Sequence, residues 1–302
     1  MMVFPHFLSL ASLVRQDGNI LLAGDNRQLA PILAHDWDNE DRPPAQLYQP
    51  FRSSYDAIRR IILETDISES SARLSQLTFT LRLPPVIRDL ISRIYRDLDD
   101  IELEGPEAVD VPPAEDVDRL EDWEQIWEGP HALNLIVHGE RESRQSNLTE
   151  ARIIENVLAA HDNHERNSIA VITPHRAQRA LLRERLAPFA EAVTVIDTVE
   201  RLQGGERPVI IVSATASDPN AISSAASFIL NLNRANVAFS RSQQRLIVVC
   251  ANTLLDHVPA ELDDYENALL WKSLRQLCTD NIAITEVEGH SVRILAPELR
   301  EA

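Results

Sequence analysis

Short apolar segments of five or six residues alternate along the chain with segments whose apolar residues recur at helical spacing. Each apolar segment is rich in β-branched residues and is bounded by polar residues, which is typical of strands buried on both faces of a sheet. Six such strands are expected, at residues 19–23, 132–137, 168–172, 192–196, 209–213 and 245–249. Helices are expected at residues 84–98, 149–161, 174–186 and 261–277. This alternation predicts an α/β protein with a parallel sheet that is covered by helices on both faces.

Two stretches interrupt the alternation. Residues 34–56 are polar and contain prolines, which predicts a long loop. Residues 99–128 combine acidic side chains with three prolines, which predicts an exposed insertion or a mobile linker. Within that stretch, Trp123 and Trp127 are four residues apart and could dock a short helix. Near the end of the chain, residues 282–295 have the pattern of one last strand.

The composition is that of a soluble globular protein, with 44% apolar and 25% charged residues. Two cysteines are too few for a disulfide framework or a cysteine-rich zinc site, and no metal site is expected. No apolar run reaches the roughly 20 residues that a membrane span needs. The apolar start at residues 1–11 lacks the basic segment of a signal peptide. The expected location is therefore the cytoplasm.

Charge is distributed unevenly. The chain has 29 basic and 47 acidic residues, and a net charge of −18 by itself argues against a nucleic-acid partner. Residues 97–128, however, hold fourteen acids and one base, so −13 belongs to this segment and −5 to the other 270 residues. The rest of the chain can therefore hold a basic groove. The acidic segment is either a solvated insertion or a mimic of nucleic acid that competes for such a groove.

The lysine count excludes one nucleotide-binding motif. A P-loop needs the pattern G-x-x-x-x-G-K-[ST], whose lysine reaches the β- and γ-phosphates. Lys272 is the one lysine of the chain, and it has no glycine nearby. The 302 residues therefore contain no P-loop.

Four polar segments are candidates for chemistry. Residues 24–31 follow a predicted strand, and ligands of parallel sheets bind at the carboxyl ends of strands. Arg82 precedes a helix that begins with proline, and its planar guanidinium could bind a phosphate. Residues 203–206 pair two glycines with Gln and Glu, as where backbone approaches a ligand. Arg234 and Arg241 are seven residues apart, on one face of a predicted helix. Taken singly, each segment also fits a surface turn, a loop or a solvated basic face.

In this order, the segments resemble helicase motifs III to VI of the superfamily 1 helicases, in the branch of the nonsense-mediated-decay and Okazaki-fragment helicases. The motif III pattern G-D-x-x-Q-L-x-P is matched by residues 24–31. The motif IV pattern T-Y-R-M-x-P is matched by Thr80, Arg82 and Pro85. Residues 171–178 are similar to the family segment V-I-T-P-Y-x-x-Q.

The last two motifs are the longest matches. The motif V pattern T-V-D-x-x-Q-G-x-E is matched by Thr198, Val199, Gln203, Gly204 and Glu206. The motif VI pattern R-x-N-V-A-x-[TS]-R is matched by Arg234, Asn236, Val237, Ala238, Ser240 and Arg241. The resemblance runs from Met1 to about Asn252. Leu81 and His175 stand where the family usually has tyrosines. The motif IV tyrosine can stack on adenine, so Leu81 bears on base preference and nucleotide affinity.

The resemblance implies a RecA-like parallel sheet of the P-loop NTPase class, with ATP and Mg²⁺ bound between two RecA-like domains. By similarity, Gln28 senses the γ-phosphate or positions the attacking water. Gly24 permits a sharp turn at the end of its strand, and Asp25 lies beside Gln28 at the nucleotide.

The arginines of the later motifs have an electrostatic part in the family. By similarity, Arg82 and Arg241 stabilise charge on the γ-phosphoryl group, with Arg241 as the arginine finger. Phosphoryl transfer depends largely on such positioning and charge. Glu206, together with Gly204, couples the nucleotide to the nucleic acid.

The nucleic-acid partner implied by the resemblance is single-stranded DNA or RNA. By similarity, Thr173, Pro174 and Thr198 line the single-strand groove, where hydroxyls and backbone amides meet phosphates. The basic helix at 174–186 could add charge to this groove, although a solvated basic face also fits it.

The resemblance divides the chain into three parts. Residues 1–70 are expected to be the tail of a first RecA-like domain, residues 71–255 a nearly complete second one that includes the acidic insertion 97–128, and residues 256–302 a C-terminal extension. Motif I is absent from the sequence, and so is motif II, the Asp-Glu-Ala pattern that holds Mg²⁺. By the family's spacing, motif II is expected just upstream of Met1.

The chain is therefore expected to be the C-terminal part of an ATP-dependent helicase or translocase, and to be inactive as an ATPase alone. Two alternatives remain open. One is a catalytically inactive module that binds nucleic acid or protein. The other is one half of a split helicase, with the first RecA-like domain on a separate polypeptide.

Overall fold

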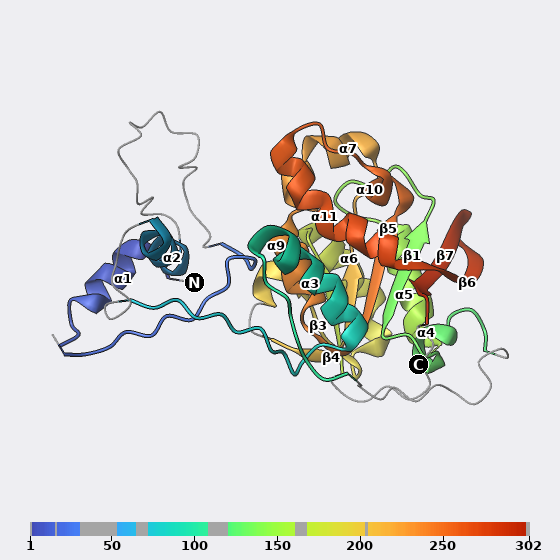
Figure 1. Cartoon of the computed structure of the whole chain (residues 1–302). Helices are drawn as coiled ribbons and strands as arrows, with labels where there is room; N and C mark the ends of the chain where they lie inside the picture. The colour runs from blue at the N-terminus through green and yellow to red at the C-terminus, as the bar shows by residue number, and fades with distance from the viewer. Residues whose placement is uncertain are drawn as a thin grey trace. The chain divides into compact units, whose positions relative to one another are not determined.

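A computed structural model describes residues 2–15, 17–30, 53–64, 72–107, 120–160, 168–202 and 205–299. Contacts divide the chain into two compact units, Met1–Leu77 and Thr78–Ala302 (Figure 1). Among the described residues, no helix is long and apolar enough to cross a membrane.

Where the structure describes the first unit, it has two helices, α1 (Phe4–Ala11) and α2 (Ser54–Glu64). The strand predicted at residues 19–23 is wrong, because this segment is irregular and the Leu21 side chain is 94% exposed. A strand is stable only when a neighbouring strand satisfies its backbone hydrogen bonds. The described residues of this unit include no strand that could do so. The loop predicted at 34–56 lies mostly outside the described residues, and α2 begins within it, at Ser54.

The second unit is built on a seven-stranded sheet with the order β3-β2-β4-β5-β1-β7-β6. Its strands are β1 (Leu133–His138), β2 (Ile169–Thr173), β3 (Val193–Thr198), β4 (Arg207–Ser213), β5 (Ser242–Ala251), β6 (Cys278–Val287) and β7 (His290–Pro297). Strands β1 to β5 run parallel, and they correspond to five of the six predicted strands. The predicted α/β class with a parallel sheet is confirmed.

The sheet ends in an antiparallel hairpin. Strand β7 pairs antiparallel with β1, and β6 pairs antiparallel with β7. The single strand predicted at 282–295 is therefore wrong, because Glu288 and Gly289 turn the chain between two strands. Their φ angles are 52° and 76°, and a two-residue hairpin turn of type I′ needs positive φ at both positions. The segment expected as an extension beyond residue 255 thus adds two strands to the sheet.

Helices cover both faces of the sheet (Figure 1). On one face, α5 (Leu148–Ala159) and α6 (Arg176–Arg185) share a buried cluster with Ile136, Val171 and Ile211. Since alternate residues of a strand point to opposite faces, the uninterrupted burial of β1 and β2 requires a second cover on the other side.

The second cover consists of α3 (Pro85–Asp99), α9 (Leu232–Phe239) and α11 (Leu262–Leu277), which contact one another. Phe239 and Trp271 join two of these helices, with ring centroids 5.5 Å apart in an edge-to-face arrangement. The four helices predicted from apolar spacing correspond to α3, α5, α6 and α11.

The remaining helical segments are short. They are α4 (Gln125–Glu128), α7 (Pro219–Ser224), α8 (Ala226–Ile229), α10 (Asn252–Asp256), η2 (Ala187–Phe189) and η3 (Val199–Arg201). Helix α4 confirms the short docked helix expected at the tryptophans, because Trp127 is buried and its Nε1 donates to the Val157 carbonyl at 2.6 Å. Residues 108–119 of the acidic insertion lie outside the described residues.

Candidate functional site

Segments that are distant in sequence bring Arg82, Glu206 and Gln243 together in the second unit. Arg82 lies in the loop before α3, and its Nη2 forms an ion pair with Glu206 Oε1. Its Nη1 donates to the Ser240 carbonyl at 3.5 Å. Gln243, at the start of β5, donates to Glu206 Oε2 at 3.1 Å. Arg82, Glu206 and Ser240, which match motifs IV, V and VI, therefore meet at one place. We call these three residues, together with Gln243, the arginine cluster.

The arginine cluster faces an open hollow of about 430 Å³. Phe79, Thr80 and Leu81 line it together with Arg82, Glu206 and Gln243. Leu81 is well exposed, so its side chain lies largely in solvent at this hollow. An aromatic ring at this position would offer a stacking surface at the hollow, which a leucine does not.

Glu206 is held in its ionised form. Hydrogen bonding from Arg82, with the charges of Arg82 and Arg241 and a hydrogen bond from Gln243, holds the pKa of Glu206 below its ordinary value, although partial burial acts in the opposite direction. Arg241 itself is buried. The charges of two guanidinium groups therefore act on this one carboxylate, and guanidinium groups are the side chains that bind phosphate most readily.

Arg234 and Arg241 do not share a helical face, so that prediction is wrong. Helix α9 ends at Phe239, and Ser240 is its C-cap, so Arg241 lies beyond the helix. The Arg234 side chain instead contacts other residues of the second unit. Its Nε donates to Glu200 at 2.9 Å, and its guanidinium lies 4.1 Å from the centroid of the Phe228 ring.

The motif III residues form a local turn in the first unit. Asp25 accepts hydrogen bonds from the Arg27 backbone at 2.9 Å and from Gln28 Nε2 at 3.0 Å. Gly24 has a steric explanation, since a Cβ at this position would lie 2.5 Å from the Tyr55 ring. Gly204, with its neighbour Gln203, lies outside the described residues.

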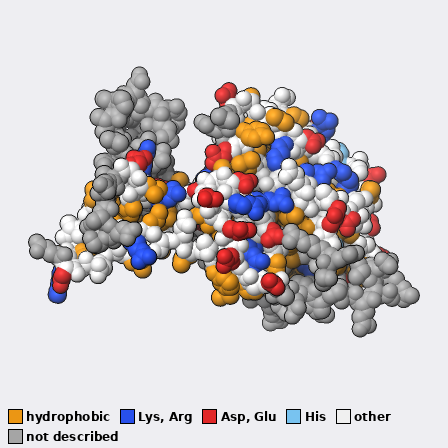
Figure 2. Space-filling model, in the orientation of Figure 1, with side chains coloured by type: hydrophobic (Ala, Val, Ile, Leu, Met, Phe, Trp, Pro, Cys, Tyr) orange, Lys and Arg blue, Asp and Glu red, His pale blue; other side chains and the backbone are white. Residues whose placement is uncertain are grey.

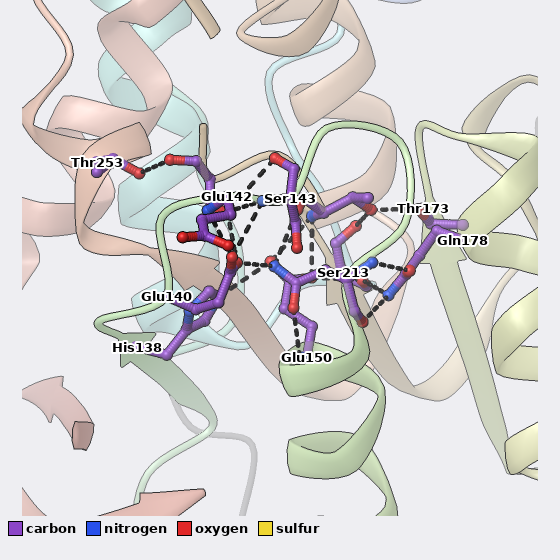
Figure 3. A network of polar contacts seen from close by, with 12 residues as sticks. His138, Glu140, Glu142, Ser143, Glu150, Thr173, Gln178, Ser213 and Thr253 are labelled. Atoms are coloured by element: carbon purple, nitrogen blue, oxygen red, sulfur yellow. Dashed lines mark hydrogen bonds and ion pairs between the residues drawn. The ribbon is translucent and has the colours of Figure 1, made fainter. Parts of the chain in front are cut away.

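A buried polar network lies at the carboxyl ends of β1, β2 and β4 (Figure 3). At its centre Glu150 accepts hydrogen bonds from the Thr215 backbone at 2.9 Å, from Ser213 and from His138 Nε2 at 3.3 Å. Thr215 has a φ of 73°, which strains a residue with a Cβ, and the Glu150 carboxylate holds its backbone there.

A second buried carboxylate shapes the loop after β1. Glu140 accepts from Asn147 Nδ2 at 2.9 Å and from the backbones of Glu142 and Ser143 at 2.6 and 3.0 Å. Burial raises the pKa of Glu140, but hydrogen bonds from Ser217 and from these backbone groups outweigh it, so the net shift is downward. Buried carboxylates therefore hold both the loop after β1 and the segment after β4 in place.

Two of the predicted nucleic-acid contacts are turned inward. Thr173 is fully buried, and its hydroxyl lies 2.9 Å from the hydroxyl of Thr215. Thr198 is also buried, and its backbone N–H donates to Asp197 at 2.8 Å. Pro174 is partly exposed. The two threonines therefore support the surface at this edge rather than present their hydroxyls on it.

The exposed groups at this edge come from the loops and from α6. Arg144 is 70% exposed and forms an ion pair with Asp218 at 3.1 Å. Arg176 is exposed at the start of α6. Farther along that helix, Arg179 pairs with Asp197 at 2.8 Å, which favours a structural role for this part of the helix.

A second open hollow, of about 380 Å³, lies among these groups, and we call it the edge hollow. His175 lines it, and its ring centroid is 5.3 Å from that of Phe228. Burial, and then the charge of Arg234, lowers the pKa of His175, so the imidazole is neutral near pH 7.

Several functional candidates were not predicted. Glu150 carries no pattern that marks it as a buried network residue, although Asn147 caps α5 by accepting from the Glu150 backbone. Gln243 and Phe228 carry no pattern of their own. Their importance appears only when β4, β5 and the helices between them are folded together.

The residues of this chain fit a nucleotide phosphate better than a metal ion. The arginine cluster offers guanidinium groups to an anion. Among the described residues, no three His, Cys, Asp or Glu side chains gather as metal ligands. Within the part of the chain that the structure describes, we therefore assign no residue to Mg²⁺.

Residues 68–253 match a family model described as an AAA domain. An Arabidopsis thaliana protein named DNA replication ATP-dependent helicase/nuclease JHS1 is 30% identical over 38% of the chain, and a Mus musculus protein named DNA replication ATP-dependent helicase/nuclease DNA2 is 28% identical over 38%. The DNA polymerase alpha-associated DNA helicase A of Schizosaccharomyces pombe is 25% identical over 76% of the chain.

The matched regions span 8%, 12% and 33% of these three relatives. Among solved structures, the arterivirus nonstructural protein 10 (helicase) with DNA aligns at 15% identity with a TM-score of 0.28, covering 59% of this chain and 26% of that one. The family model covers more than half of the 302 residues. The chain belongs to this AAA domain family of the superfamily 1 helicases.

Proposed function

We propose that this chain is the part of an ATP-dependent helicase or translocase that supplies arginines to the nucleotide and a binding edge to a single strand. The meeting of Arg82, Glu206 and Gln243 beside Arg241 carries this proposal. These residues lie in three separate segments of the chain, and the cluster that they form suits a phosphate.

Arg82 is the group that would respond to a nucleotide. Its guanidinium now binds the carboxylate of Glu206. Because a guanidinium fork binds carboxylates and phosphates with similar geometry, Arg82 can exchange Glu206 for a phosphate oxygen. Bound ATP supplies the γ-phosphoryl group, and Arg82 and Arg241 would stabilise the charge on it.

The carboxyl edge of the sheet is the proposed strand-binding surface. Its exposed side chains include Arg144 and Arg176, and Pro174 is partly exposed. The buried network of Glu140 and Glu150 lies at the same edge. A rigid edge with exposed arginines suits a phosphate backbone, because affinity for a single strand depends on charge and on a preformed track.

The chain alone is proposed to be inactive as an ATPase, because its sequence holds no P-loop to bind the β-phosphate. We expect the purified chain with single-stranded DNA to show no ATP turnover above buffer in a phosphate-release assay. Turnover that depends on Arg241 is expected only after addition of a polypeptide that carries a P-loop. Robust turnover by the chain alone, abolished in Arg241→Ala, would contradict this proposal.

A further inference from the structure

Two chemically different kinds of side chain line the edge hollow. Ala221, Ala225 and Ile229 contribute apolar groups, together with the ring of His175. The polar groups are guanidinium, amide and hydroxyl groups that form hydrogen bonds, and they come from Arg144, Gln145, Asn220 and Ser224. A nucleobase matches such a mixed lining, because its face is apolar and its edge is polar.

The ring of His175 is held by neighbouring side chains. It packs against Phe228 at 5.3 Å between centroids, and Arg234 lies over the same Phe228 ring at 4.1 Å. Glu200 in turn holds the Arg234 guanidinium at 2.9 Å. The imidazole is therefore already ordered by its packing. A ligand that lies against it does not incur the entropy cost of ordering this side chain.

Phosphate charge is one of two contributions to strand binding that this edge can make. The net charge outside residues 97–128 is −5, and on the face that Figure 2 shows, basic and acidic side chains of the second unit are interspersed. Arg144 itself is paired with Asp218. Stacking of bases does not depend on phosphate charge, so it would add to the attraction of the exposed arginines.

We propose that the edge hollow binds a base of a single-stranded nucleic acid, with the base against His175 and its polar edge toward Gln145 and Asn220. This proposal rests on the proposed strand-binding function and adds the part of the strand that is recognised. Arg144 and the exposed Arg176, next to His175, would then face the phosphates on either side of that base.

The test compares two DNA probes that have the same phosphates. A fluorescently labelled oligothymidylate and a fully abasic strand of the same length are titrated with the intact chain at low salt. Because stacking contributes about 1–3 kcal/mol per base, we expect the oligothymidylate to bind at least about fivefold more tightly.

A variant that fills the hollow locates the effect. Ala225→Leu puts a larger side chain at the lining of the hollow, and Ala190→Leu is the matched control at an exposed alanine that does not line it. We expect Ala225→Leu to bind both probes equally, with the abasic affinity of the unaltered chain. That retained abasic affinity shows that the variant is folded, and Ala190→Leu should keep the full preference.

Three outcomes overturn the proposal in different ways. Equal affinity of the unaltered chain for both probes would refute the base site while leaving strand binding intact. Binding of neither probe at low salt would refute the proposed function, and the base site with it. Retention of the preference in Ala225→Leu would place base recognition elsewhere in the chain.

Discussion

At the scale of single residues, the proposed chemistry depends most directly on the ion pair between Arg82 and Glu206. The two side chains are about one-third exposed, at 35% and 34%. Solvent therefore screens their attraction, and the pair contributes at most about 1 kcal/mol to stability. The ion pair matters more because it holds the Arg82 guanidinium at the hollow, where a phosphate could replace the carboxylate of Glu206.

Glu206→Gln is expected to lower the free energy of unfolding by less than about 1 kcal/mol at pH 7. The pKa of Glu206 is lowered in the folded state, chiefly by the Arg82 hydrogen bond. This contribution is therefore fully present above the ordinary glutamate pKa and is lost as pH falls through the folded-state pKa. Urea unfolding of both proteins should show a difference at pH 7 that shrinks as the pH falls below about 4. A difference that grows toward acid pH would show that the carboxylate is not stabilised by its neighbours.

Residue patterns identified the arginines but not the network beneath the strand ends. Arg82 and Glu206 belong to recognisable motifs, so their meeting could be anticipated. Glu150 contacts Ser213 and Thr215, more than sixty residues away, and nothing in its local sequence encodes that contact. Buried polar partners are fixed by the fold, and a sequence read segment by segment does not show them.

At the scale of elements, Glu150 links helix α5 to the ends of β1 and β4. The five parallel strands and helices α3, α5, α6 and α11 were predictable because apolar spacing records which faces are buried, whereas α2 was not predicted. The strand at 19–23 failed because its apolar run has no neighbouring strand among the described residues. The helix that was to hold both Arg234 and Arg241 failed because α9 ends at Phe239, before the second arginine.

Glu150→Gln is expected to destabilise the chain by about 2–3 kcal/mol. The amide keeps the shape of the side chain, but its NH₂ group faces donors from Thr215 and Ser213, and the lost charge-assisted bonds leave buried donors unsatisfied. Denaturant unfolding measures the change.

Glu155→Gln is the matched control on the same helix. Glu155 lies closer to solvent and pairs with Arg152 at 2.8 Å, so its loss is expected to cost less than about 1 kcal/mol. Equal destabilisation by the two substitutions would show that the network has no special weight in holding the strand ends.

At the scale of the whole molecule, the account depends on which surface of the second unit carries function. The sheet places the polar network and the edge hollow at the carboxyl ends of its parallel strands, where ligands of such sheets bind. The acidic character of the chain belongs mainly to residues 97–128, which the net charge alone conceals. The assignment of the carboxyl edge to a single strand is the central claim.

The most direct test is the salt dependence of single-strand binding, measured by fluorescence anisotropy without ATP on the intact chain. We expect binding at low salt that weakens as salt increases, and Arg176→Ala should reduce the slope of log K against log salt by about one. Arg96→Ala, at an exposed arginine near the end of α3, should leave the slope unchanged. Absence of binding at low salt, or equal effects of the two substitutions, would contradict the assignment of the carboxyl edge as the strand-binding surface.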